Sequence, residues 1–267
     1  MTFAEPSALP LISRAQQRSA RRLLSRRERD ESGLFLAEGA QAVREALRLP
    51  ERVEAVIVVD PAAHADLLAE ADEAICWSAH PDDMAQLSDT VTPQGIVAIC
   101  RQTLAGLDEI VAPRLVVLCA QVRDPGNAGT VIRCADDFGA DAVIFTKGSV
   151  EVHNPKTVRS SVGSIFHLPI VVGVEIADAV AWLHQQGVQV LATDGGGTHL
   201  DELGEDLARP TAWLMGNEAW GLPERERSLA DQVVGVPMWG QAESLNLSTA
   251  AAVCLYATAS AQRRARP

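Results

Sequence analysis

The sequence has few cysteines, and none lies in a pattern that binds metal or forms a disulfide framework. There are five, scattered and never spaced C-x-x-C: Cys76, Cys100, Cys119, Cys134 and Cys254. The six histidines are equally dispersed. Zinc sites and disulfide scaffolds need regular spacings of these residues. We therefore expect reduced core cysteines in a cytoplasmic protein, and no metal.

Long hydrophobic runs and the common nucleotide-binding patterns are also absent. No apolar run approaches the roughly 20 residues that span a membrane, and the polar N-terminus lacks the apolar core of a secretory signal. No G-x-G-x-x-G pattern follows the apolar run at 114–120, and no Walker A lysine pattern occurs. These absences argue against a membrane protein, a dinucleotide-binding domain and a P-loop protein.

Positive charge is scarce and unevenly placed. The chain has 23 Lys and Arg against 35 Asp and Glu, so its net charge is −12. Residues 14–29, by contrast, hold seven arginines against one acid, Glu28. An acidic body argues against indiscriminate nucleic-acid binding, whereas a basic segment favours a localised contact with phosphates. A solvated helix face explains the cluster equally well. The candidate RNA contacts in it are Arg18, Arg21, Arg22 and Arg26.

Length and hydrophobic patterning predict two α/β domains after a basic arm. The 267 residues are 47% hydrophobic and 22% charged, as expected for a globular chain of one large or two ordinary domains. We expect the arm over 1–30, a smaller α/β domain over 31–105 and a larger one over 106–267. In the smaller domain, apolar runs predict strands at 33–39, 53–59 and 95–100, and helical spacing predicts helices at 40–49 and 61–71.

The larger domain has continuous apolar strands that alternate with helices, which is typical of a parallel sheet covered on both faces. Strands are predicted at 114–120, 141–146, 168–173, 188–194, 211–215 and 233–238. Helices are predicted at 128–138, 155–163 and 175–186, and from Ser244 onward. Parallel sheets bind ligands at the carboxyl ends of their strands. The loops expected to form a site are therefore 121–128, 194–199, 216–223 and 238–244.

The first of these loops begins the motif RDPGNAGTVIRCADDFGAD at 123–141. Pro125 and Gly126 predict a turn, and Asn127 is well placed to cap the following helix. Arg133 lies further along that helix. Taken alone, the segment is better explained as an ordinary cap and a surface arginine than as a functional site.

The other three loops carry one motif each. ATDGGGTHL at 192–200 offers bare backbone to a ligand, although a flexible loop explains it too. LMGNEAWGLPE sets Glu218 in a glycine-rich turn at the end of a strand, an unusual place for a purely structural acid. In VPMWGQAESLNLSTAAAV, which begins at 236, Ser244 is a natural N-cap. Asn246 is a poor helix former, which indicates another task for its side chain.

Together, in this order and spacing, the motifs resemble those of the SpoU (TrmH-type) branch of the SPOUT RNA methyltransferases. NAGTVIR is similar to the family's N-x-G-x-x-x-R motif, and MGNEAWGL is similar to its glycine-asparagine-glutamate loop. VPMWGQAESLNLSTAAAV is similar to its third motif, and the resemblance covers about 114–262. HNPKTVRSSVGSIFHLPI resembles the family's linking segment. GLFLAEGAQAVREAL resembles the substrate-binding domain of rRNA-modifying members. One departure is Ala219, where many members carry glycine.

The resemblance implies an α/β fold in which a C-terminal parallel-sheet domain with a deep trefoil knot follows a smaller ribosomal-protein-like domain. It also implies a homodimer and S-adenosyl-L-methionine as cofactor. The cofactor-binding positions that it implies are Gly216, Val236 and Leu245, and the bare turn at Gly195 suits the same cofactor. The turn around Glu218 is expected to be bare because side chains there would obstruct the adenosyl group. The catalytic-site positions that it implies are Asn127, Arg133, Glu218, Ser244 and Asn246.

Two roles remain open from the sequence. Glu218 is expected to orient an arginine rather than to attract the sulfonium. Arg133 matches the family's proposed activator of the hydroxyl, but arginine stays protonated at ordinary pH. It acts either as a base or by stabilising a phosphate and the forming alkoxide. Arg159, in KTVRSSVG, is a candidate phosphate clamp, with a solvated helix charge as the equal alternative.

The implied activity is 2′-O-methylation of a ribose in rRNA, most simply 23S rRNA. One alternative is the same chemistry on tRNA. Another is a non-catalytic RNA-binding or ribosome-assembly protein that keeps the fold. A pure binder would have no use for Asn127, Arg133, Glu218 and Asn246 together, which argues against the second alternative.

Overall fold

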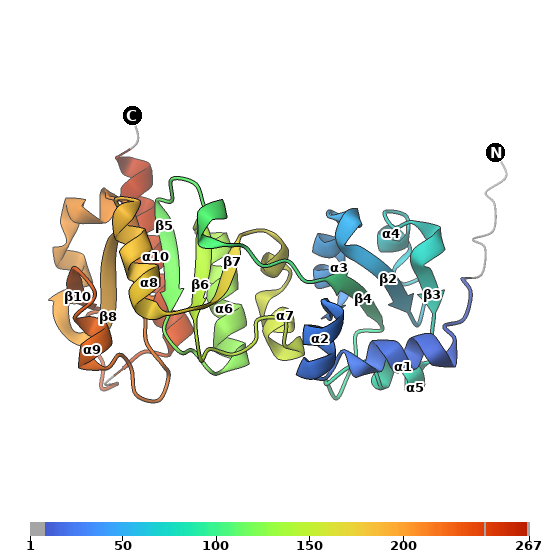
Figure 1. Ribbon diagram of the computed structural model, residues 1–267. Coiled ribbons are helices and arrows are strands. Elements are labelled where there is room, and N and C mark those ends of the chain that lie inside the picture. Colours follow the sequence, from blue (N-terminus) through green and yellow to red (C-terminus); the bar gives the residue numbers. More distant parts are fainter. Residues whose placement is uncertain (1–8, 243, 266–267) are drawn as a thin grey trace. The chain divides into compact units, whose positions relative to one another are not determined.

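The computed structural model describes residues 9–242 and 244–265, which pack into two compact units (Figure 1). Of the described residues, the first unit contains those up to Gln102 together with His153–Phe166. The second contains Thr103–Val152 and the described residues from His167 onward. This division differs from the predicted one in two respects. The segment 14–29 packs within the first unit, and so does 153–166, which the sequence placed in the larger domain.

The first unit is built on a four-stranded sheet in the order β1-β4-β2-β3. Its strands are β1 (Leu34–Glu38), β2 (Val53–Val58), β3 (Cys76–Ser78) and β4 (Ile96–Arg101). Strand β4 runs antiparallel to both β1 and β2, whereas β3 runs parallel to β2. Three of the strands match predicted apolar runs. β3 was missed because three residues are too few to show a period.

Six α-helices in the described part of the first unit surround this sheet. They are α1 (Arg14–Arg22), α2 (Arg26–Ser32), α3 (Ala40–Leu47), α4 (Ala65–Leu68), α5 (Pro81–Ala85) and α7 (Pro155–Ser161). A capping box between Ser13 and Gln16 starts α1. Ala20 and Leu23 are buried in the same core as Ile57. The arginine-rich segment is therefore anchored to the sheet by its apolar side.

The second unit is built on a six-stranded parallel sheet in the order β10-β8-β9-β5-β6-β7. Its strands are β5 (Leu115–Cys119), β6 (Ala142–Thr146), β7 (Ile170–Val174), β8 (Gln189–His199), β9 (Thr211–Met215) and β10 (Gln232–Gly235). This confirms the predicted parallel sheet. Strands β10, β8 and β9 are neighbours on one side of β5 and run parallel, so their carboxyl ends lie side by side at one edge of the sheet.

Helices cover both faces of this sheet, as Figure 1 shows. On one face, Val116 and Leu214 share a core with Leu183 of α8 (Ile176–Gln185). On the other face, the fully buried Trp213 donates from Nε1 to Oγ1 of Thr258 in α10 (Leu247–Arg264), at 2.9 Å. Helix α6 (Pro125–Asp137) packs against α10. The second unit is thus a three-layer arrangement of helices, sheet and helices.

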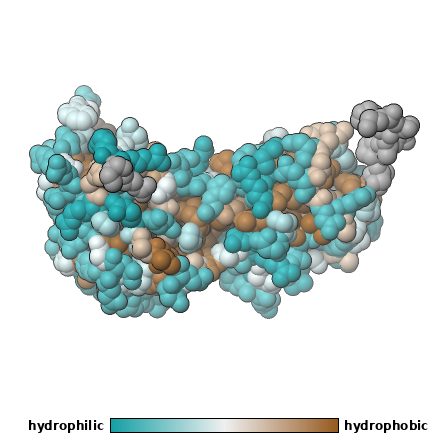
Figure 2. Space-filling model, turned by 90° about the horizontal axis from the view of Figure 1, so that it is seen from above, coloured by the Kyte–Doolittle hydropathy of each residue, from teal (hydrophilic) through white to brown (hydrophobic). Residues whose placement is uncertain are grey.

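The five cysteines are free, and four of them are buried. Burial raises the pKa of the Cys254 thiol to about 12 and raises that of Cys100 further. Between residues 9 and 265, leaving out 243, no group of three metal-ligating side chains occurs and no helix is long and apolar enough to cross a membrane. The face in Figure 2 is mostly hydrophilic, with hydrophobic residues in smaller patches.

Candidate active site

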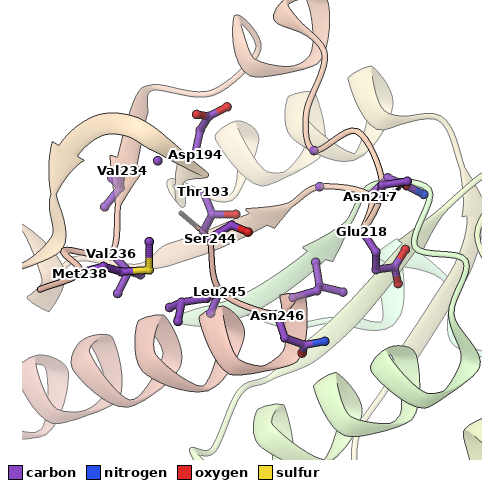
Figure 3. A pocket seen from close by; sticks show the side chains of 16 residues that line it. Thr193, Asp194, Asn217, Glu218, Val234, Val236, Met238, Ser244, Leu245 and Asn246 are labelled. Carbon is purple, nitrogen blue, oxygen red and sulfur yellow. Dashed lines mark hydrogen bonds between the residues drawn. The ribbon is translucent and has the colours of Figure 1, made fainter. Parts of the chain in front are cut away.

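A pocket of about 530 Å³ lies in the second unit, where β8, β9 and β10 end (Figure 3). Three separate segments form it: residues 193–195 within β8, the loop after β9, and the chain from Val234 of β10 to the start of α10. The loop predicted at 194–199 is instead the second half of β8. Seven residues predicted from the sequence line it, namely Gly195, Gly216, Glu218, Val236, Ser244, Leu245 and Asn246. Figure 3 shows Val236 and Met238 at one end of the pocket and Glu218 at the other. The pocket therefore has an apolar end and a polar end.

The loop after β9 is a tight hairpin held by the buried side chain of Asn217. The backbones of Asn217 and Gly221 exchange two hydrogen bonds, at 3.0 and 2.9 Å. Asn217 donates from Nδ2 to the carbonyl of Gln121, at 2.6 Å. A Cβ atom on Gly216 would lie 2.5 Å from the carbonyl carbon of Gly221. Glycine is needed at 216 because a side chain there would clash with the backbone of Gly221. Room for a cofactor is a second, separate reason for a glycine at this position.

Glu218 faces the start of α6 rather than the centre of the pocket. Its carboxylate accepts the backbone N–H groups of Arg123 and Asp124, each at 3.2 Å. It also accepts Nδ2 of Asn127, at 3.4 Å. Glu218 therefore holds the 123–127 segment in place. The groups that it orients are backbone N–H groups and the Asn127 amide, rather than the arginine side chain expected from the sequence.

The N-cap predicted for α6 was wrong. Asp124, not Asn127, caps the helix, because its carboxylate accepts the Asn127 N–H at 2.8 Å. Pro125 then occupies the first helical position, where proline is favoured because it has no N–H to satisfy. The Asn127 side chain is consequently free of capping and reaches towards Glu218 and Asn246.

The N-cap predicted for α10 was also wrong. The helix begins at Leu247 and its cap is Asn246, whose Oδ1 accepts the N–H groups of Ser248 and Thr249. Asn caps helices as well as Ser does, and capping explains why a poor helix former stands at position 246. Its Nδ2 donates to Oδ1 of Asn127, at 3.0 Å. Ser244 lines the pocket two residues before the cap.

Arg133 is not brought to this pocket within the chain. It lies six residues after Asn127 on α6, so its side chain leaves the helix about 120° away from that of Asn127. The Arg133 side chain is 52% exposed, and its Nε lies 3.8 Å from a carboxylate oxygen of Asp137. The other four predicted catalytic-site residues line the pocket or join its hydrogen bonds, and Arg133 does neither.

The candidate RNA-binding arginines lie in the first unit. Arg159 is held by two carboxylates, those of Asp89 and Glu38, and is only 29% exposed. A phosphate contact there would have to compete with both acids. Arg22 and Arg26 pair with Glu28 and Asp30. Arg21 donates to Gln86, and Arg18 is exposed on α1.

Sequence reasoning missed three polar residues of the pocket, Thr193, Asp194 and Asn217. Strand β8 bulges at Thr193 and Asp194, because Ala192 and Thr198 are the residues opposite Val233 and Val234. Asp194 lines the pocket and pairs with Arg227 at 2.7 Å. A signal was available, since Asp194 ends a predicted strand immediately before the glycine triplet.

The lining fits the expected cofactor, S-adenosyl-L-methionine. The volume lies within the range of small-molecule sites, which are mostly apolar with a few placed polar groups. Val236, Met238 and Leu245 provide an apolar wall for an adenine ring. Asp194 offers a carboxylate to hydroxyl or ammonium groups, and Gly195 has open space where a Cβ would project. These residues could hold the cofactor without a metal.

Comparison with known proteins identifies the family. Residues 114–256 match the model of the SpoU rRNA Methylase family. The chain belongs to this family. Residues 15–98 match the MRM3-like substrate binding domain, which covers most of the first unit. The SpoU assignment accounts for the four motifs, and the second match accounts for the separate N-terminal unit.

Similar family members carry specific names. The chain is 35% identical over 237 residues to the 23S rRNA (guanosine(2553)-2′-O)-methyltransferase RlmP of Bacillus subtilis, which covers 88% of this chain and 92% of that protein. It is also 35% identical to a 23S rRNA (uridine(2479)-2′-O)-methyltransferase of Streptomyces viridochromogenes, over 66% of this chain and 64% of that one. These two relatives differ in their target base.

Solved structures of similar methyltransferases share the fold along nearly the whole chain. The AdoMet-bound rRNA methyltransferase from Sinorhizobium meliloti superposes with a TM-score of 0.82 at 30% identity, over 97% of this chain and 98% of that one. AviRb from Streptomyces viridochromogenes, in complex with AdoMet, has a TM-score of 0.80 at 29% identity, over 96% and 100%. Both structures contain the expected cofactor.

Proposed function

We propose that this SpoU family member methylates the 2′-hydroxyl of a ribose in 23S rRNA, with S-adenosyl-L-methionine as the methyl donor. The observation that carries the proposal is the chain of hydrogen bonds Glu218–Asn127–Asn246 beside the pocket. Its three members come from three separate motifs. The names of the relatives, both 23S rRNA 2′-O-methyltransferases, support the same reaction.

S-adenosyl-L-methionine supplies an activated methyl group, so the protein has to bind it, place the ribose hydroxyl in line and favour loss of the hydroxyl proton. The apolar wall and the bare backbone at Gly195 and Gly216 serve binding. Glu218 fixes the 123–127 segment, which sets the direction of the Asn127 amide. Asn127 and Asn246 then present polar groups at the polar end of the pocket, where the hydroxyl would enter.

We also propose that the protein is a homodimer whose sites are completed across the subunit contact. Arg133 lies away from the pocket within one chain, although its motif assigns it to the reaction. In a twofold dimer each subunit can lend a residue to the other's site. We also propose that the second unit contains the trefoil knot implied by the family, and that the protein is cytoplasmic.

The alternative of a tRNA substrate is weaker. A tRNA-related structure matches only 58% of this chain, with a TM-score of 0.51 at 28% identity. The first unit instead matches the MRM3-like substrate binding domain. A non-catalytic role is also weaker, because a pure binder gains nothing from the hydrogen-bonded polar groups around the pocket.

The test combines cofactor binding with methyl transfer. Calorimetry should show binding of S-adenosyl-L-methionine, and tritium from the labelled methyl group should pass to total RNA, in the large-subunit rRNA fraction. Binding without transfer to any RNA would favour the non-catalytic alternative. Transfer confined to the tRNA fraction would favour the tRNA alternative.

A further inference from the structure

A large aromatic side chain stands exposed beside the pocket. Trp220 lies at the tip of the hairpin after β9, between Ala219 and Gly221, which both line the pocket. The residue is 48% exposed. An indole carries a large apolar surface that proteins usually bury against other groups. Neither the fold nor the cofactor pocket explains why this one is left open.

The ring of Trp220 is backed by a cation. The Arg123 guanidinium carbon lies 4.9 Å from the ring centroid, within the range of a cation–π contact. The Arg123 backbone N–H also donates to Glu218, two residues before Trp220. The hairpin tip is therefore joined to the 123–124 segment twice, once through Glu218 and once through the indole ring.

The hairpin that carries Trp220 is also fixed at its base. Asn217 is 5% exposed, exchanges two backbone hydrogen bonds with Gly221 and accepts the N–H of Ala219 at 2.8 Å. An aromatic ring that is held at base and tip binds a partner at a lower entropic cost than a freely rotating one. The geometry is that of a preformed flat surface with a positive charge behind it.

We propose that Trp220 is the stacking platform for a base of the RNA, on the nucleotide whose ribose enters the site. This rests on the proposed function and adds a binding residue to it. Single-stranded nucleotides are commonly bound by stacking on aromatic rings, because every base has a π-face. Arg123, behind the ring, adds positive charge that favours the adjacent phosphates.

Stacking of this kind selects an unpaired nucleotide without selecting its identity. A base within a duplex already stacks on its neighbours and does not expose its face. Trp220 would therefore favour a target in a loop, a bulge or a locally opened helix. The choice between bases would depend on other contacts.

A second exposed tryptophan provides the matched control. Trp239 follows Met238 of the pocket wall and is 89% exposed. Nothing in the described part of the chain stacks on its ring, in contrast to Trp220. The remaining tryptophans, Trp77, Trp182 and Trp213, are partly or fully buried. Fluorescence quenching by RNA therefore reports mainly on Trp220 and Trp239.

The kinetic test uses Trp220→Ala, Trp220→Leu, Trp220→Phe and Trp239→Phe, with unmodified 23S rRNA transcripts as substrate. We expect Trp220→Ala and Trp220→Leu to raise KM for the RNA about tenfold. Trp220→Phe should stay within about threefold of the wild type, because it keeps an aromatic face. Cofactor affinity by calorimetry should not change in any variant. A Trp220→Leu protein that matches Trp220→Phe would overturn the proposal, since it would show that only apolar packing matters.

The binding test does not depend on turnover. RNA should quench the fluorescence of the wild type and of Trp239→Phe, and the quenching should fall sharply in Trp220→Phe. Quenching that is kept in Trp220→Phe and lost in Trp239→Phe would contradict the proposal and assign the stacking to Trp239. If the wild type binds RNA but transfers no methyl group, the proposed function fails, whereas this comparison still decides whether Trp220 stacks on RNA.

Discussion

Asn246 donates a hydrogen bond from Nδ2 to Oδ1 of Asn127, at 3.0 Å. Asn246 is the N-cap of α10, and Asn127 lies in the first turn of α6. The bond therefore ties together the N-termini of two helices, each of which carries partial positive charge. Glu218 accepts from Asn127 on its other side. The helix cap and the hydrogen bonds among Glu218, Asn127 and Asn246 therefore fix these polar groups before any ligand binds.

Two substitutions at Asn246 should separate its structural role from its functional one. Asn246→Asp keeps a cap acceptor but loses the donor to Asn127, whereas Asn246→Ala loses both. We expect Asn246→Ala to lower the free energy of unfolding by about 1 kcal/mol. Asn246→Asp should unfold like the wild type and still transfer methyl groups more slowly. Denaturant titration and single-turnover assays measure the two effects, and a wild-type rate in Asn246→Asp would show that the bond is not needed.

Two of the glycines that line the pocket, Gly216 and Gly195, should respond differently to alanine. A Cβ at Gly216 would meet backbone at 2.5 Å, whereas a Cβ at Gly195 would meet nothing within 4 Å. Overpacking of this kind costs about 1–3 kcal/mol. We expect Gly216→Ala to lower Tm and cofactor affinity together, and Gly195→Ala to leave Tm unchanged. Thermal unfolding checks this, and an equal Tm for both variants would contradict it.

The motifs predicted which loops form the site, because strand ends and glycine-rich turns leave local signals. They could not predict which residue caps each helix. Asp124 and Asn127 are both good caps, as are Ser244 and Asn246, so the choice depended on where each helix begins in the fold. The hydrogen bond between Asn127 and Asn246 joins residues far apart in the chain, and no local pattern encodes it.

The predicted domain boundaries differ from the two units for a similar reason. Segment 153–166 has the helical pattern of its neighbours in the chain, but its Arg159 pairs with Glu38 and Asp89. Ion pairs between residues so far apart in the chain leave no periodic pattern in the sequence, so they cannot be predicted from it. The strands of the parallel sheet were predictable, in contrast, because burial on both faces gives continuous apolar runs.

His153 should make stability depend on pH. It is buried 4.6 Å from the ring of Phe35, and burial, with the charge of Arg29, lowers its pKa from 6.5 to about 4. The unfolded chain takes up a proton below pH 6.5, whereas the folded chain does so only near pH 4. Stability is therefore lost as the pH falls through this window, by roughly 2 kcal/mol at pH 5. Denaturant titration at pH 7.5 and 5 should show a smaller drop for His153→Gln, and an equal drop would exclude this assignment.

The arginines of the first unit should differ in their effect on RNA binding. Arg14 and Arg18 are exposed and pair with no acid in the described residues, whereas Arg26 and Arg27 pair with Asp30 and Glu31. Replacing Arg14 and Arg18 by Gln should lower the slope of log affinity against log salt by about one for each phosphate that is no longer bound. The matched Arg26→Gln/Arg27→Gln protein should change less. Unchanged slopes in both proteins would identify the cluster as a solvated face.

The shared site can be tested by complementation. Arg133→Ala should abolish methyl transfer and leave cofactor affinity intact, and Gly216→Trp should abolish cofactor binding. After dissociation and reassociation of the two proteins, a heterodimer with sites shared between chains has one intact site, so activity reappears. If each site is built within one chain, every site carries one lesion. An inactive mixture whose heterodimers are verified by mass would rule the shared site out.

The most direct test of the proposed activity is the position of the methyl group itself. 23S rRNA from a strain lacking the protein would be incubated with the purified protein and S-adenosyl-L-methionine, then mapped for ribose methylation against wild-type rRNA. We predict one nucleotide that gains a 2′-O-methyl group, at the position that the deletion strain has lost. Methyl groups found only on bases, or no position that differs between the two strains, would contradict the account.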